Sequence, residues 1–168
     1  MDYNQVSDIS SVANMTMLVN LFLSYNQISD LSPLANLTNW DNSLYGFLYI
    51  GLSNNQISDV SPLANLAYLP ELSLDLSENQ ISDISSIAGL TNLTSLDLGN
   101  NMVSNLTPLS NLTNLTQLGL GINPVSDIAP LANLKNLIKL DLRVKDRRID
   151  ESTQEWLKSQ LPDCDIAF

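Results

Sequence analysis

Histidine is missing from this chain of 168 residues, and cysteine occurs only once. General bases, metal ligands and thiolate nucleophiles come largely from these two residue types, so their scarcity argues against most classes of enzyme. The single cysteine excludes an intramolecular disulfide. No phosphate-binding loop, dinucleotide fingerprint or zinc-ligand spacing is present. The sequence therefore predicts a protein that has no catalytic activity and needs neither a cofactor nor a metal ion.

Positive charge is missing from the first 134 residues, which hold eleven acidic side chains and no lysine or arginine. All seven basic residues lie after that point, and the net charge of the chain is −11. Such an anionic surface repels the phosphates of nucleic acids and of anionic lipids. We therefore expect neither nucleic acid nor a membrane as a partner. The charge either keeps copies of the chain apart or attracts a protein partner with a basic patch.

Leucine and asparagine are abundant, with 32 and 20 copies, and they recur in a repeated phrase. The phrase N-x-I/V-S returns at intervals of 22, 29, 24, 22 and 22 residues, and apolar residues follow each asparagine at two, five, eight and eleven residues. From the second copy on, leucine or isoleucine also stands three and five residues before it. Self-similarity at this period indicates a solenoid. The asparagines are Asn4, Asn26, Asn55, Asn79, Asn101 and Asn123.

Each repeat has a simple physical interpretation. Alternating leucines predict a short strand with leucine pointing inward, and the asparagine amide can satisfy backbone groups at the turn that follows. Proline then stands where the first turn of a helix accepts it. The predicted fold is therefore α/β: a right-handed leucine-rich repeat solenoid, or horseshoe, with a parallel concave sheet and short 3₁₀/α convex elements. We predict that a structural asparagine ladder runs through it, made of Asn26, Asn55, Asn79, Asn101 and Asn123.

The stretch Asn26-Gln-Ile-Ser-Asp-Leu-Ser-Pro-Leu-Ala-Asn-Leu-Thr38 closely resembles the 22-residue repeats of bacterial internalins and of phosphatase-regulating leucine-rich repeat proteins. The resemblance extends over about residues 1–145 and implies a protein-recognition module or, alternatively, a scaffold or regulatory subunit of an enzyme. The internalin likeness favours a cell-surface or secreted location. No signal peptide and no apolar run long enough to span a bilayer is present. The helical cap and the immunoglobulin-like module that normally flank internalin repeats are not evident.

We divide the chain into about six repeats in residues 1–145 and a C-terminal cap in residues 146–168. In the cap, Asp150 is the predicted N-cap of a helix over 151–161 with Trp156 on its apolar side, and residues 164–168 alternate like an edge strand. The chain enters halfway through a repeat, which indicates either part of a longer chain or an open end that pairs with another molecule. We otherwise expect a monomer.

Two repeats are longer than 22 residues. Seven extra residues fall near 37–43 and two near 70–73, and both insertions are expected to bulge outward before the next strand. The simpler interpretation is drift in a tolerant loop. The alternative is a projecting recognition loop led by Trp40.

Two sets of carboxylates invite a chemical interpretation. Asp75 and Asp97 are expected on adjacent strands about 5 Å apart at the backbone, which suggests a glycosidase pair. An open sheet has no wall to separate their pKa values, so an acidic strip for a basic partner is preferred. A second column supplies too few oxygens per repeat for Ca²⁺, and bonding to turn backbone explains it better. This column comprises Asp8, Asp30, Asp59, Asp83 and Asp127, with Asn105 in the gap.

Aromatic residues make up only 6% of the chain, yet Phe22 and Tyr49 are expected to point outward from neighbouring strands. An outward phenylalanine gains no core packing, so its presence needs another reason. Interfaces concentrate binding energy in aromatic anchors, so we predict that a protein partner binds the N-terminal half of the concave face. The alternative is that an upstream segment covers these aromatics. The predicted contact residues are Phe22, Tyr49, Tyr25, Trp40, Asp75 and Asp97.

Overall fold

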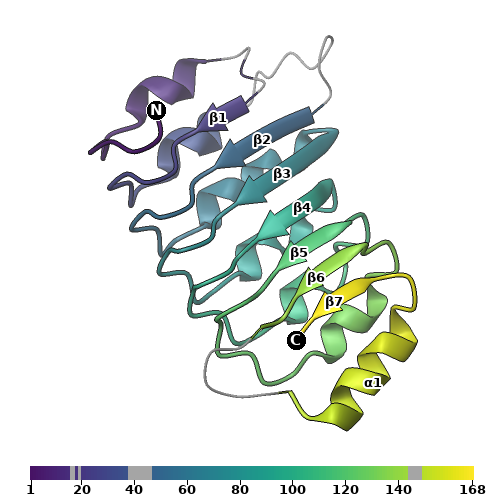
Figure 1. The fold of residues 1–168 in the computed structure, drawn as a ribbon. Helices are drawn as coiled ribbons and strands as arrows, with labels where there is room; N and C mark the ends of the chain where they lie inside the picture. The colour runs from purple at the N-terminus through teal and green to yellow at the C-terminus, as the bar shows by residue number, and fades with distance from the viewer. Residues whose placement is uncertain (16–17, 19, 38–46, 144–148) are drawn as a thin grey trace.

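A computed structural model describes residues 1–15, 18, 20–37, 47–143 and 149–168. In this part of the chain seven parallel strands form one sheet, and their spatial order follows the sequence (Figure 1). The architecture confirms the predicted leucine-rich repeat horseshoe. The strands are β1 (Asn20–Phe22), β2 (Phe47–Gly51), β3 (Glu71–Asp75), β4 (Leu93–Asp97), β5 (Gln117–Gly119), β6 (Lys139–Asp141) and β7 (Asp165–Ala167).

Short 3₁₀ helices cover the side of the sheet that faces away from the concave surface (Figure 1). A proline occupies the first turn in four of them, where its missing N–H costs nothing. With about 22 residues in a repeat, one strand and one such helix complete the unit. The 3₁₀ helices are η1 (Ser10–Asn14), η2 (Ser32–Asn36), η3 (Ser61–Tyr68), η4 (Ser85–Gly89), η5 (Thr107–Leu109) and η6 (Ala129–Asn133).

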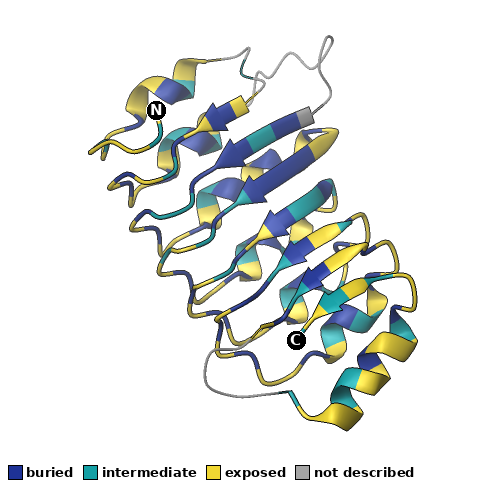
Figure 2. Cartoon of the chain, in the orientation of Figure 1, coloured by how far each residue is buried: buried dark blue, intermediate teal, exposed yellow. Residues whose placement is uncertain are grey.

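Leucine and isoleucine from every repeat form one continuous core between the sheet and the 3₁₀ helices (Figure 2). In the repeat around β4, for example, Leu93, Leu96 and Leu98 are buried from the strand side, and Ile84 and Ile87 from the other. Each repeat therefore stacks its apolar residues on those of its neighbours, as a solenoid requires. No helix in the described part of the chain is long and apolar enough to cross a membrane.

The asparagine ladder joins each turn to the repeat before it. The Oδ1 atom of Asn101 accepts a hydrogen bond from the backbone N–H of Ile81 at 2.9 Å. Its Nδ2 donates to the carbonyls of Leu98 and Gly99 in the same turn and of Leu76 in the preceding one. The amide thus satisfies backbone groups at the turn after the strand, as predicted, and also groups of the preceding repeat. Equivalent bonds are made by Asn26, Asn55, Asn79 and Asn123.

The residue before each of the six repeat asparagines, Asn4 included, has a left-handed backbone conformation, with φ between 54° and 58°. Asparagine tolerates this region, but a β-branched residue such as Ile122 is strained there. Ile122 is also 47% exposed, so core packing does not explain its presence. The six residues in this position are Tyr3, Tyr25, Asn54, Glu78, Asn100 and Ile122.

The two extra residues of the second longer repeat lengthen its 3₁₀ helix. η3 has eight residues where η2 and η4 have five, whereas β3 has five residues like β2 and β4. The extra length therefore lies before the strand, on the side of the sheet that the 3₁₀ helices cover. The pairing of β3 with β4 shifts register between Leu72 and Ser73, with the additional residue on β4. The longer insertion falls on residues 38–46, outside the described residues, and so does Trp40.

The C-terminal segment forms a helix and a strand against the last repeat. Helix α1 (Glu151–Gln160) begins at Asp150, whose carboxylate accepts hydrogen bonds from the backbone N–H and hydroxyl of Thr153. A hydrogen bond from the Ser152 hydroxyl and these two bonds from Thr153 lower the pKa of Asp150 to about 2. Leu157 and Leu161 are buried, whereas Trp156, expected on the same apolar side, is 39% exposed. Strand β7 pairs with β6.

We expect Asn101→Ala to lower the free energy of unfolding by about 1–3 kcal/mol, because it leaves buried backbone groups of two repeats unpaired. Urea titration followed by circular dichroism measures the change. Asn105→Ala is the matched control, since it removes only an exposed bond to the backbone N–H of Thr107. Equal midpoints for the Asn101 variant and the wild type would contradict the ladder's role.

We expect Ile122→Asn to raise the free energy of unfolding by about 1 kcal/mol, because asparagine relieves left-handed strain and already occupies this position at Asn54 and Asn100. Ile138→Asn is the control: Ile138 is likewise exposed, but it is not among the left-handed residues. A gain for both variants, or for neither, would show that backbone strain at Ile122 does not limit stability.

Candidate functional site

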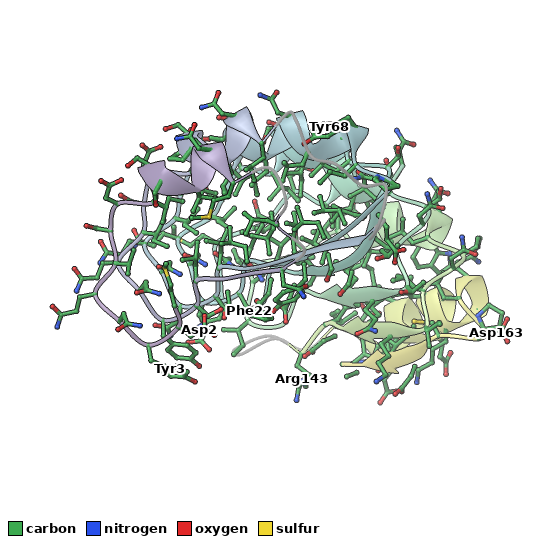
Figure 3. The ribbon with its side chains drawn as sticks, turned by 90° about the horizontal axis from the view of Figure 1, so that it is seen from above. Asp2, Tyr3, Phe22, Tyr68, Arg143 and Asp163 are labelled. Atoms are coloured by element: carbon green, nitrogen blue, oxygen red, sulfur yellow. The ribbon has the colours of Figure 1, made fainter. Side chains whose placement is uncertain are left out.

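The concave face presents two columns of side chains, because every second strand residue points away from the core. Register holds these columns in line from strand to strand. Figure 3 places Phe22 and Arg143 on this side of the sheet, away from the 3₁₀ helices and Tyr68. The first column contains Asn20, Tyr49, Ser73, Ser95, Gln117, Lys139 and Asp165. The second contains Phe22, Gly51, Asp75, Asp97, Gly119, Asp141 and Ala167.

Phe22 and Tyr49 come together at the N-terminal end of the concave face. Their ring centroids are 5.3 Å apart with the ring planes tilted by 41°. A Cβ atom on Gly51 would lie 3.0 Å from Cε1 of Tyr49, so the tyrosine ring leans over this glycine toward Phe22. Phe22 nevertheless stays 50% exposed. The two aromatic residues that were expected to point outward from neighbouring strands are therefore in contact, and one of them is half exposed.

Tyr25 stacks on Tyr3, a residue that the sequence analysis did not single out. The two rings are 4.2 Å apart and nearly parallel, and Tyr3 is 75% exposed. Contact with Tyr3 raises the pKa of the Tyr25 phenol. The signal was present in the sequence, since both tyrosines stand directly before a repeat asparagine and so occupy the same place in successive turns. Phe22, Tyr49, Tyr3 and Tyr25 are called the aromatic end below.

Asp75 and Asp97 are direct neighbours in the second column, on β3 and β4. They do not share a hydrogen bond; each accepts one from the backbone N–H two residues further on. For Asp75 the donors are the N–H and hydroxyl of Ser77, and for Asp97 the donor is the N–H of Gly99 at 2.8 Å. Both carboxylates are therefore oriented by their own turns.

The next carboxylate in the column, Asp141, is neutralised. The Arg143 guanidinium donates to both of its oxygens and holds its pKa below the usual range. Asp97 differs, because the surrounding atoms of the concave floor displace water and raise its pKa, although its surface remains accessible. The charges of Asp75 and Asp141 add to this rise. The ionised form of Asp97 is thus less stabilised by its surroundings than the ionised form of Asp141.

The second acidic column is bound to its own turns. Each carboxylate accepts a hydrogen bond from the backbone N–H two residues on, at the start of a 3₁₀ helix, and Asn105 does the same. In four of these turns the backbone N–H of the serine two residues on lowers the pKa of the carboxyl. The four carboxyls are those of Asp8, Asp30, Asp59 and Asp83. Within the described ranges no group of three or more acidic, histidine or cysteine residues is placed to hold a metal ion.

A family profile described as "Leucine Rich repeats (2 copies)" matches residues 72–111. Among solved structures, the internalin inlF of Listeria monocytogenes is 35% identical, with a TM-score of 0.80 over 98% of this chain and 45% of that one. Internalin C2 of the same species is 40% identical, with a TM-score of 0.76 over 99% and 69%. A leucine-rich repeat protein of Leptospira interrogans is 28% identical, with a TM-score of 0.80 over 98% and 41%. No curated protein sequence matches the chain.

Fold and comparisons together define a leucine-rich repeat protein, a class whose members typically serve as protein–protein interaction modules. The chain belongs to the internalin family, because it is 40% identical to internalin C2 and covers 69% of its length. It spans less than half the length of inlF and of the Leptospira protein. The Listeria relatives suggest a bacterial origin.

We expect Asp97→Asn to stabilise the protein at neutral pH relative to acid pH. A carboxyl whose pKa is raised by folding stabilises the fold below its unfolded pKa and loses that contribution as pH rises. The difference in Tm between variant and wild type should therefore grow from about pH 3 to about pH 7. Asp83→Asn is the control of opposite sign, because folding lowers the pKa of Asp83. Parallel pH profiles for the two variants would contradict the assignment.

Proposed function

We propose that the chain is a non-catalytic recognition module that binds a protein partner on its concave face, with the aromatic end as the anchor. One observation carries the proposal: Phe22 is half exposed on a sheet whose other face is core, and it is paired with Tyr49. Such a pair adds nothing to the hydrophobic core. Protein interfaces concentrate their binding energy in aromatic anchors of this kind.

The charge pattern supports a partner with a basic patch. Asp75 and Asp97 follow the aromatic end along the concave face, and no lysine or arginine occurs before residue 135. Complementary charge speeds encounter and selects among partners, while the same surface repels nucleic acid and anionic membranes. A monomer presents this face freely. The Trp40 segment is a second candidate contact.

The carboxylate pair does not support a hydrolase. A general acid of that type needs one carboxyl removed from water beside one that stays ionised. Asp97 remains accessible on an open face, and Asp75 is only partly covered. Binding of a cationic group is the better use of both.

Quantitative capture tests the proposal. The wild type and the double variant Phe22→Ser/Tyr49→Ser are immobilised, and bound proteins are measured by mass spectrometry and then titrated singly. We expect the double variant to lose at least tenfold in affinity for the specific partner, about 1.4 kcal/mol. Asp75→Asn/Asp97→Asn should weaken the salt-dependent part of the association.

Met102→Ser is the matched control, because Met102 is 52% exposed but follows the asparagine turn and does not lie on a strand. If folded Phe22→Ser/Tyr49→Ser protein binds the partner as the wild type does, the aromatic end is not the anchor. Recovery of one enzyme in fixed ratio, indifferent to these substitutions, would favour a scaffold or regulatory subunit.

A further inference from the structure

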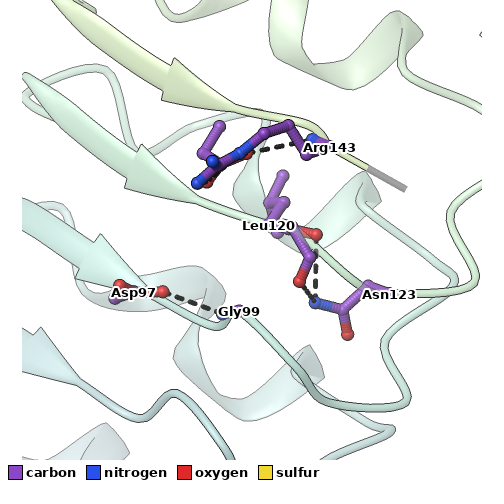
Figure 4. Close-up of polar contacts among 7 residues, drawn as sticks. Asp97, Gly99, Leu120, Asn123 and Arg143 are labelled. Atoms are coloured by element: carbon purple, nitrogen blue, oxygen red, sulfur yellow. Dashed lines mark hydrogen bonds and ion pairs between the residues drawn. The ribbon is translucent and has the colours of Figure 1, made fainter. Parts of the chain in front are cut away.

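A cavity lies further along the molecule than the aromatic end, where the chain leaves strands β3 to β6. Its volume is about 510 Å³, within the range of specific ligand sites. Figure 4 shows Asp97, Gly99 and Arg143 in this region. The residues that matter most for its chemistry are Ser77, Glu78, Asp97, Gly99, Ile122 and Arg143.

Glycine makes room for the acidic floor of the cavity. A Cβ atom on Gly119 would lie 2.4 Å from Oδ1 of Asp97, so this carboxylate rests directly over the backbone of the next strand. A Cβ atom on Gly99 would lie 3.1 Å from the same oxygen. On the far side, a Cβ atom on Gly121 would lie 3.2 Å from Oδ1 of Asp141. A side chain at Gly119 would displace Asp97.

The charged and hydroxyl donors among the side chains of the cavity are already engaged, so the charged groups that remain for a ligand are acceptors. The Arg143 guanidinium is engaged by Asp141, and the Ser77 hydroxyl donates to Asp75. Within the described part of the chain, Asp97 accepts only the Gly99 N–H, and the one ion pair there joins Arg143 to Asp141 and leaves Asp97 out. Glu78 accepts one bond from the Asn54 amide. The ligand must therefore bring both positive charge and N–H donors.

One wall is apolar. Ile122 lines the cavity, is 47% exposed and has a left-handed backbone conformation. An aliphatic chain that ends in a cation fits an apolar wall beside a carboxylate floor, and lysine and arginine side chains have this form.

We propose that this cavity binds one lysine or arginine side chain of the protein partner, with its cationic group on Asp97 and its methylene stem along Ile122. The inference rests on the proposed function in that the side chain belongs to a protein partner. It adds a second, charge-specific contact separate from the aromatic end.

Short peptides test the cavity without the partner. The probes are acetyl-Gly-Arg-Gly-amide and acetyl-Gly-Lys-Gly-amide, with acetyl-Gly-norleucine-Gly-amide as the uncharged analogue. Each is titrated into the full chain labelled with ¹⁵N, and the amide signals of Gly99, Gly119 and Gly121 are compared with that of the remote Gly89. We expect the cationic probes to shift the first three with millimolar affinity that falls with salt. The norleucine probe should leave them unshifted.

Two variants separate charge from geometry. Asp97→Asn removes the charge and should weaken binding of the cationic probes at least tenfold. Gly119→Ala keeps the charge but displaces the flexible carboxylate, and it should weaken binding as well. Asp83→Asn is the matched control, because it removes an acid bound to its own turn on the other side of the repeat, and it should bind the probes like the wild type.

Equal binding by Asp97→Asn and the wild type, or equal losses in Asp83→Asn and Asp97→Asn, would overturn the proposal in favour of general attraction to an acidic surface. The outcome is independent of the aromatic end, since Phe22→Ser/Tyr49→Ser should still bind the probes. Loss of the protein partner in that variant with no probe binding by the wild type would refute the cavity alone. Probe binding with full retention of the partner would refute the anchor alone.

Discussion

The whole structure depends on an amide that serves two repeats at once. A 22-residue unit made of one strand and one 3₁₀ turn leaves backbone donors and acceptors unpaired at the corner after the strand. One asparagine side chain accepts from the preceding repeat and donates to both, as Asn101 does with Ile81, Leu98 and Leu76. No single repeat closes its own hydrogen bonds, so folding is a property of the stack.

That dependence explains why the fold could be predicted from the sequence. The spacing of asparagine and leucine is dictated by the corner and the core, and both recur in every unit, so the strands, their order and the outward columns follow from periodicity. Local chemistry also sufficed for Asp150, whose cap position is defined by neighbouring residues. The stacking of Tyr3 on Tyr25 was equally present in the register, because the two residues are equivalent in successive repeats.

Features set by one repeat alone could not be predicted in this way. The two extra residues of the 24-residue repeat lengthen η3, and the periodicity of the other repeats does not say which element takes them up. Of the three apolar residues in the predicted helix over 151–161, Leu157 and Leu161 are buried and Trp156 is exposed, a difference that helical spacing alone does not settle. The cavity beside Asp97 arises from glycines in three positions, each unremarkable in its own repeat. Its acidic floor depends on the carboxylate of Asp97 lying against Gly119 of the next strand, where a Cβ atom would lie only 2.4 Å from Oδ1 of Asp97.

Because the columns stay in register across all seven strands, the distance between two residues of one column is a whole number of strand spacings of about 4.8 Å. The aromatic end and the cavity beside Asp97 occupy fixed positions along these columns, and each is built from residues of neighbouring repeats. Gain or loss of one whole repeat between them would change the distance between the two sites by one strand spacing and leave both sites intact. Evolution of such a chain can therefore retune the distance between two contacts without redesigning either one.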